Sequence, residues 1–315
     1  MARPLPAQLW SCTFGGTGSM FSARHRALPG TVLETGSVAY LFDCGDGALS
    51  RLKAMGIGSI DLVAVTSIGT SETSGLLALG EAQRTSAGAP LAVVGPPGLR
   101  DALAALSCVS TLPADELFSV TELQPGCSFP GTVAGHHLEA VEVECESNST
   151  IAYRLFEDSR PGRVDASKAS RLGIKGPEIG LLQAGERVRN VRPEDVVGPR
   201  RRGRRFVFAG RGRPTEDLEA ALLDAECAVF AAPFMDDRFE LAEESSFMTG
   251  WEASALCERH GVSTVVLLQL GPYAPARFFV AEARQFHAQT FAPNDGEQLV
   301  IPVPDSGPPS FVKRR

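Results

Sequence analysis

Histidine is scarce in this sequence, and no cysteine pair has the spacing of a metal site. The 315 residues contain five histidines and seven cysteines, without a CxxC or a similar ligand motif. Protein zinc sites need several such donors close together. The odd, scattered set of cysteines also argues against a disulfide framework and favours free, buried thiols in a reducing compartment.

Long apolar runs and excess positive charge are also missing. No apolar stretch is long enough to cross a bilayer, and the N-terminal MARPLPAQLWSCTFGG lacks the pattern of a secretory signal. We therefore expect an intracellular protein without a membrane span; a mitochondrial or other organelle matrix stays open, since a presequence could have been removed. The net charge of −7 argues against wrapping of nucleic acid but allows one local basic patch.

The patterns that are present indicate an α/β fold. Apolar runs bounded by Gly and Asp alternate with segments of helical spacing in both halves of the chain, which predicts sheets covered by helices on their outer faces. GTVLETGSVAYLF predicts a hairpin. PTEDLEAALLDA and TGWEASALCERHG predict helices that begin at a threonine cap. Between the halves, residues 158–203 are polar and rich in Gly and Pro, which is typical of a functional insertion.

Several motifs resemble those of RNase Z, the tRNA 3′-processing endonuclease of the metallo-β-lactamase superfamily. They are FGGTGSMFSARHRALPGTVLE, LFDCGDGALSRL, VVGPPGLR, SRPGRVDASKASRLGIKGPEIGLLQAGERV and PEDVVGPRRRGRRFVFAG. The resemblance runs from about residue 10 to residue 304. It implies a four-layer αβ/βα metallo-β-lactamase sandwich over residues 1–304, in which residues 158–203 form the arm that grips the tRNA elbow. Residues 305–315 are expected to be a flexible tail.

The resemblance also implies two zinc ions held by histidines and carboxylates, because metal-bound hydroxide is the nucleophile of such enzymes. Carried over motif by motif, the family's site residues fall on positions without histidine. These positions are Ser67, Gly69, Ser71, Glu72, Glu146, Arg211, Ala231, Phe247 and Leu268. We expect no metal and no cofactor here, apart from a weak Mg²⁺ or Ca²⁺ contact left open at Glu72 and Glu146. Arg211 is expected to pair with one of these two carboxylates. The resulting prediction is a pseudoenzyme.

A run of arginines borders the insertion and is the candidate RNA-binding patch. Its members are Arg200, Arg201, Arg202, Arg204 and Arg205, joined by Lys175, Arg187 and Arg189 from the arm. The alternative is a solvated turn whose arginines pair with Glu194 and Asp195.

Three functions follow for comparison with the structure. The first is a catalytically inactive RNase Z-like subunit of a ribonucleoprotein or RNA-processing assembly, such as the ribosome. Its expected partners are tRNA or rRNA and other proteins of the assembly or an RNase Z-like paralogue. The second is a metal-dependent hydrolase with a reorganised site. The third is a scaffold subunit that binds no RNA.

Overall fold

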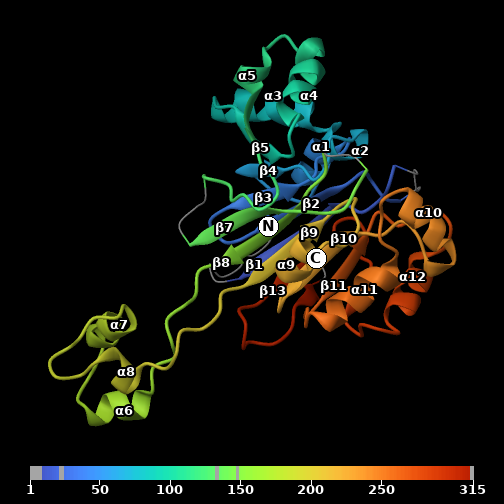
Figure 1. The fold of residues 1–315 in the computed structure, drawn as a ribbon. Helices are drawn as coiled ribbons and strands as arrows, with labels where there is room; N and C mark the ends of the chain where they lie inside the picture. Colours follow the sequence, from blue (N-terminus) through green and yellow to red (C-terminus); the bar gives the residue numbers. More distant parts are fainter. Residues whose placement is uncertain (1–8, 21–24, 132–134, 147–148, 313–315) are drawn as a thin grey trace.

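Two mixed β-sheets stack face to face, helices cover their outer faces, and one long excursion of the chain leaves the body (Figure 1). The computed structural model describes residues 9–20, 25–131, 135–146 and 149–312. The predicted four-layer αβ/βα sandwich is confirmed. Part of the first RNase Z-like motif, residues 21–24, lies outside the described residues.

The first sheet joins the N-terminal half of the chain to its last two strands. In spatial order it contains β14 (Ser310–Val312), β13 (Gln298–Ile301), β1 (Trp10–Gly16), β2 (Gly30–Glu34), β3 (Ala39–Phe42), β4 (Leu62–Ala64), β5 (Leu91–Gly95) and β6 (Phe118–Glu122). Strands β2 and β3 form the predicted antiparallel hairpin, and β3 to β6 run parallel. The loops that follow these parallel strands therefore lie along one edge of the sheet.

The second sheet repeats this plan with the later half of the chain. In spatial order it contains β12 (Thr290–Phe291), β11 (Val265–Leu268), β10 (Cys227–Ala231), β9 (Arg205–Ala209), β8 (Ala152–Glu157) and β7 (His136–Val141). Strands β9 to β12 are parallel, whereas β7, β8 and β9 pair antiparallel. The apolar runs RFVFA and CAVFA are central strands, which explains why they lack an alternating pattern.

Aromatic side chains fill the space between the two sheets. Phe42 of the first sheet stacks on Phe208 of the second with ring centres 4.9 Å apart, and Trp10 and Tyr153 are fully buried beside them. The hydroxyl of Tyr153 donates to the carbonyl oxygen of Val65 at 2.7 Å, across the sandwich. Burial of this apolar surface is the main force that holds the sheets together.

The helices form the two outer layers. Those of the first half are α1 (Ala48–Ala54), α2 (Thr70–Thr73), α3 (Leu76–Ala87), α4 (Leu99–Leu106), η1 (Ser107–Val109) and α5 (Ala114–Leu117). Those of the second half are α9 (Glu216–Leu222), η2 (Asp236–Arg238), α10 (Phe239–Glu244), α11 (Gly250–Arg259) and α12 (Ala276–Ala283). Thr215 and Thr249 cap α9 and α11 as predicted.

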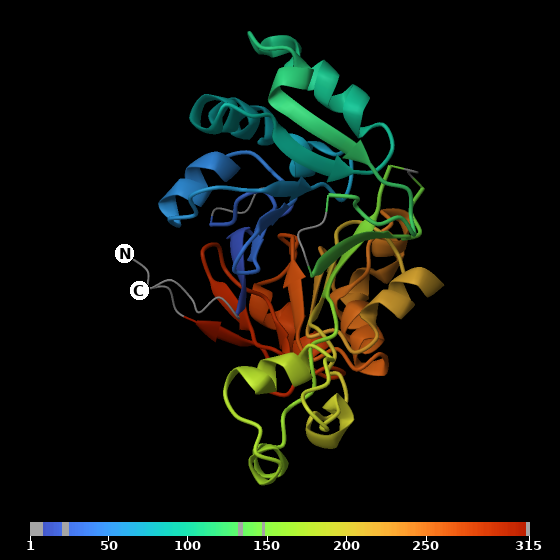
Figure 2. The ribbon, with the colours of Figure 1, turned by 90° about the vertical axis from the view of Figure 1, so that its left-hand side faces the viewer.

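Residues 158–203 form an arm that stands away from the body in Figure 1 and projects from its lower end in Figure 2. It contains α6 (Ala166–Arg171), α7 (Pro177–Gln183) and α8 (Pro193–Val196). These helices share a small apolar core of their own, formed by Ala169, Ile174, Leu182, Val188, Val191 and Val196. The β-bridges Arg160–Arg201 and Val164–Val197 join the outgoing and returning segments of its stalk. The arm is therefore a folded unit on a paired stalk.

The C-terminal segment differs from the expected flexible tail. Residues Ser310–Val312 form β14 and pair with β13, and Phe311 packs against Phe14 and Phe291. The aromatic side chain of Phe311, two residues beyond the Gly-Pro-Pro segment, anchors this strand, so the domain extends past residue 304. Among the described helices, none combines the length and the apolar character that crossing a membrane requires.

Candidate functional site

The positions carried over from the zinc site lie together at one edge of the sandwich. Ser67 follows β4, Arg211 follows β9, and Leu268 is the last residue of β11. Carboxyl ends of parallel strands meet at one edge of a sheet, which is where ligands bind in α/β folds. Short contacts join the loops: the backbone N–H of Ile151 donates to the carbonyl oxygen of Thr66 at 2.9 Å.

Gly210 lets the two sheets approach closely at this edge. A Cβ atom on Gly210 would lie 2.5 Å from Oγ1 of Thr66, a distance that no methyl group tolerates. A glycine is therefore required between β9 and Arg211, and the AG of the motif RRFVFAG is explained by packing.

Two carboxyl groups are buried in the site. Glu72 is 8% exposed and its Oε1 accepts a hydrogen bond from Ser71 Oγ at 2.7 Å. Burial raises its pKa, although hydrogen bonds from Ser71 and Ser67 and the charge of Arg211 oppose the rise. Asp43 is fully buried after β3 and accepts from the backbone N–H of Thr66 at 2.8 Å. Burial and the nearby Glu72 charge raise the pKa of Asp43. Our assignment of site residues missed Asp43, although its place after an apolar strand in LFDCGDG was a usable signal.

Arg211 does not pair with a carboxylate, so that prediction is wrong. Its Nε donates to the carbonyl oxygen of Ser245 at 2.8 Å, and its guanidinium carbon lies 5.7 Å from the centre of the Phe247 ring. Within the described residues no carboxylate oxygen lies within 4.0 Å of this guanidinium. Glu146 is exposed, and the contact that the structure gives it is a backbone N–H 3.5 Å from Ser246 Oγ.

The residues at the site do not fit two zinc ions. Leu268 and Ala231 are buried apolar residues, Phe247 presents a ring, and Arg211 brings a positive charge. In the part of the chain that the structure describes, no three His, Cys, Asp or Glu side chains gather as a metal-binding group. Zinc pairs need imidazole nitrogen and carboxylate donors, which this set does not supply.

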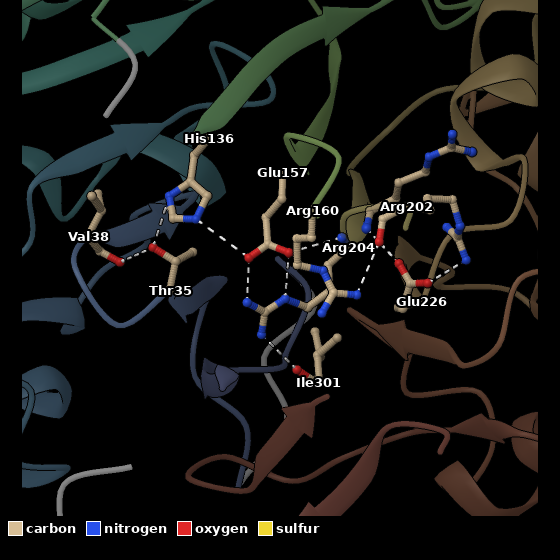
Figure 3. A network of polar contacts seen from close by, with 10 residues as sticks. Thr35, Val38, His136, Glu157, Arg160, Arg202, Arg204, Glu226 and Ile301 are labelled. Atoms are coloured by element: carbon tan, nitrogen blue, oxygen red, sulfur yellow. Dashed lines mark hydrogen bonds and ion pairs between the residues drawn. The ribbon is translucent and has the colours of Figure 1, made fainter. Parts of the chain in front are cut away.

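The arginine run divides into buried and exposed members, and Figure 3 shows the contacts of Arg204 and Arg202. Arg204 is 4% exposed, and its Nε donates to Glu157 Oε2 at 2.9 Å while its guanidinium lies 4.7 Å from the Trp10 ring centre. Burial alone would raise the pKa of Glu157, but hydrogen bonds from His136 and Arg204 lower it to about 2. This ion pair closes the root of the arm, so Arg204 has no surface to offer to RNA.

Arg202 and Arg205 also serve the root of the arm. Arg202 Nη2 lies 2.6 Å from Glu226 Oε1, and the backbone N–H of Arg205 donates to Glu226 Oε2 at 2.6 Å. Glu226 precedes β10, so these contacts fasten the start of β9 to its neighbour. The alternative partners Glu194 and Asp195 lie in α8 of the arm and pair with neither arginine.

The other five predicted RNA-binding residues lie on the arm or its stalk. Arg200 Nε donates to Ser159 Oγ at 2.8 Å, and Arg201 Nε donates to the carbonyl oxygen of Pro161 at 3.2 Å. Arg189 pairs with Glu178 at 2.5 Å, while Lys175 and Arg187 are exposed. Their contact with RNA stays a prediction.

A groove of about 380 Å³ separates the stalk from the arm helices. Glycine, alanine, proline and aliphatic residues line most of it. Three polar side chains also contribute to its wall: Gln183, Glu194 and Arg200. Gly162 is needed here, because a Cβ atom would lie 1.8 Å from the carbonyl oxygen of Gly198. The wall of the groove is therefore mostly apolar.

Solved structures with the same fold agree with this architecture. The short form of human tRNase Z superposes with a TM-score of 0.67 at 16% identity, covering 93% of this chain and 99% of that chain. The metallo-β-lactamase fold protein YhfI from Bacillus subtilis gives 0.67 at 14% identity, with the same coverage. Such distant likeness shows the fold alone. No protein-family model matches the chain.

Sequence relatives are nearer and carry one name. Ribonuclease Z of Halorubrum lacusprofundi is 33% identical over 309 residues, covering 93% of this chain and 98% of the relative. Ribonuclease Z of Myxococcus xanthus is 31% identical with the same coverage. Relatives named for an RNA-processing hydrolase contradict the prediction that the chain is not an enzyme, and that prediction is wrong. Identity at this level over nearly the full length of both proteins places the chain in the Ribonuclease Z family.

Proposed function

We propose that the protein acts in RNA processing by binding tRNA, with the arm as the grip that holds the substrate against the edge of the sandwich. The observation that carries this proposal is the arm itself, a folded unit with its own core on a paired stalk. An excursion of this size would not keep three helices and a core if it served only to connect two strands.

The charge of the arm supports a nucleic-acid partner. Residues 158–203 contain eleven Lys and Arg against six Asp and Glu, whereas the rest of the chain contains 19 against 31. The positive charge of this acidic protein is thus concentrated on the part that stands furthest from its body. A local basic surface attracts phosphates, while the acidic body discourages non-specific wrapping.

The contacts at the root of the arm favour an arm whose orientation relative to the body is fixed. Arg204 joins Glu157 of β8 to the carbonyl oxygen of Ile301 in β13, so both sheets hold the point where the arm leaves. A rigid root lets the arm set the distance between the bound RNA and the site edge, because binding energy is not spent on ordering a loose connection.

The hydrolytic class comes from the family, and cleavage of precursor tRNA is the activity to assay. The relatives named Ribonuclease Z support an RNA substrate, and tRNA is the one that we propose. The donor set of this chain does not fit a zinc pair, so the arm and not the metal chemistry carries the proposal.

The test measures tRNA affinity for the wild type and for a triple variant of exposed arm cations, Lys175→Ser, Arg187→Ser and Arg200→Ser. Each lost phosphate contact should lower the salt dependence, with the slope of log K against log salt falling by about 1 per contact. A matched triple variant on the body, Arg84→Ser, Arg100→Ser and Arg259→Ser, should leave the slope unchanged. Equal effects of both triples would reject the arm as the grip.

A further inference from the structure

Arg211 is held through its Nε, while its two terminal nitrogens make no contact that the structure shows among the described residues. Its Nε is fixed by the carbonyl oxygen of Ser245, and the ring of Phe247 lies 5.7 Å behind the guanidinium. Among the described residues its two terminal nitrogens have neither a hydrogen-bond acceptor nor an ion-pair partner. The side chain is half-buried and interacts with the Glu72 carboxylate only through charge, so its terminal N–H groups are available to a ligand.

Arg213, the next arginine along the chain, has partners for both of its terminal nitrogens. Arg213 Nη2 lies 2.6 Å from Glu252 Oε1, and its Nη1 donates to the carbonyl oxygen of Phe247 at 2.9 Å. These contacts tie the loop after β9 to the start of α11. Arg213 therefore has a structural role, whereas no contact within the described residues explains the terminal nitrogens of Arg211.

The acids near Arg211 are engaged elsewhere or lie at the surface. The Glu72 carboxylate accepts a hydrogen bond from Ser71 and lies beyond 4.0 Å of the guanidinium. Asp43 is occupied by Thr66. Glu146 contacts the Ser246 hydroxyl through its backbone. None of these carboxylates forms an ion pair with Arg211, although the charges of Glu72 and Arg211 interact at longer range.

We propose that Arg211 is a phosphate-binding residue, whose terminal N–H groups bind the oxygen atoms of a phosphate at the edge of the sandwich. A guanidinium presents parallel donors that match two phosphate oxygens, and a partly buried position strengthens the contact. The chain's own cation thereby stands where the resemblance implies zinc, and it changes the preferred ligand from a dication to an anion. Phosphate in RNA as the source rests on the proposed function, whereas binding of free phosphate does not.

The first test uses inorganic phosphate and thermal unfolding of the full chain. Phosphate should raise the Tm of the wild type by mass action, since it binds the folded state. Arg211→Gln should weaken the affinity about tenfold or more, the usual effect of losing a charged hydrogen-bond donor, and Arg211→Lys should recover part of it. Arg213→Gln is the matched control: it should lower the Tm without ligand and keep the phosphate response.

Three results would overturn the proposal. Arg211→Gln could respond to phosphate as the wild type does, or both Gln variants could lose the response equally. The wild type could also lose its phosphate response when one equivalent of Zn²⁺ binds, because a dication would then occupy the position that the proposal assigns to an anion.

The second test separates the two sources of phosphate. With tRNA as ligand, Arg211→Gln should lower the salt slope by about 1 if the bound phosphate belongs to RNA. An unchanged slope together with a lost response to inorganic phosphate assigns the site to free phosphate and sustains it. If the triple variant of the arm binds tRNA like the wild type while the response to inorganic phosphate is intact, the proposed function is rejected and the phosphate site is not.

Discussion

Glu157, the last residue of β8, and Arg204, the residue before β9, form an ion pair across the root of the arm. The side chains are 12% and 5% exposed, so the pair is almost dry. Trp10 lies against the guanidinium from the first sheet. His136 of β7 approaches the carboxylate at 3.8 Å (Figure 3). The ends of the arm are therefore joined to each other and to both sheets at one point.

Removing one partner of this pair should cost much more stability than removing a surface pair. Glu157→Gln leaves Arg204 buried without a counter-charge and should lower the free energy of unfolding by about 3 kcal/mol. Urea denaturation measures the difference. Glu178→Gln, which breaks the exposed pair with Arg189, should cost less than about 1 kcal/mol. Equal losses in the free energy of unfolding would show that the buried pair at the root contributes no more stability than the surface pair.

The same pair sets a pH dependence. The pKa of Glu157 is about 2 in the folded protein, below its ordinary value of 4.5. A depressed pKa means that the unfolded chain takes up the proton first, so the contribution is complete above pH 4.5 and is lost as the pH falls toward 2. Between pH 5 and pH 3, urea denaturation should show the wild type losing more stability than Glu157→Gln. Parallel losses would contradict this.

Gly210 should be irreplaceable for a packing reason. Gly210→Ala puts a methyl group 2.5 Å from Thr66 Oγ1 and forces the sheets apart, which should cost about 1–3 kcal/mol. Gly180→Ala in α7 is the control, because open space surrounds that position and alanine favours the helix by about 0.5–1 kcal/mol. Thermal unfolding of both variants checks the contrast, and a neutral Gly210→Ala would refute the close approach.

Chelation should leave the protein unchanged. The donor set at the site lacks imidazole and contains Arg211, so EDTA should not lower the Tm and Zn²⁺ should not raise it saturably. A saturable increase of several degrees at one or two equivalents of Zn²⁺ would show that other residues supply the ligands.

The sequence predicted many strands and helix caps because these are locally encoded, whereas the four-layer sandwich was predicted from the resemblance to RNase Z. Runs such as RFVFA become central strands, and Thr249 caps α11 with Glu252 as the spacing indicates. The partners of long polar side chains could not be predicted. Arg200 and Arg204 belong to one arginine-rich segment of the sequence. Arg204 nevertheless lies between the two sheets, and Arg200 lies at the surface of the stalk. Only the tertiary fold decides which arginine meets Glu157, and the same holds for Arg211, which meets Ser245.

The most direct test of the account is tRNA binding by a chain whose arm is removed at the stalk. Replacing residues 161–200 with a short Gly-Ser turn keeps the Arg160–Arg201 bridge and the buried root. The account predicts that this variant unfolds within a few degrees of the wild type, yet binds tRNA at least about tenfold more weakly. Unchanged tRNA affinity in a folded, arm-deleted chain would contradict it.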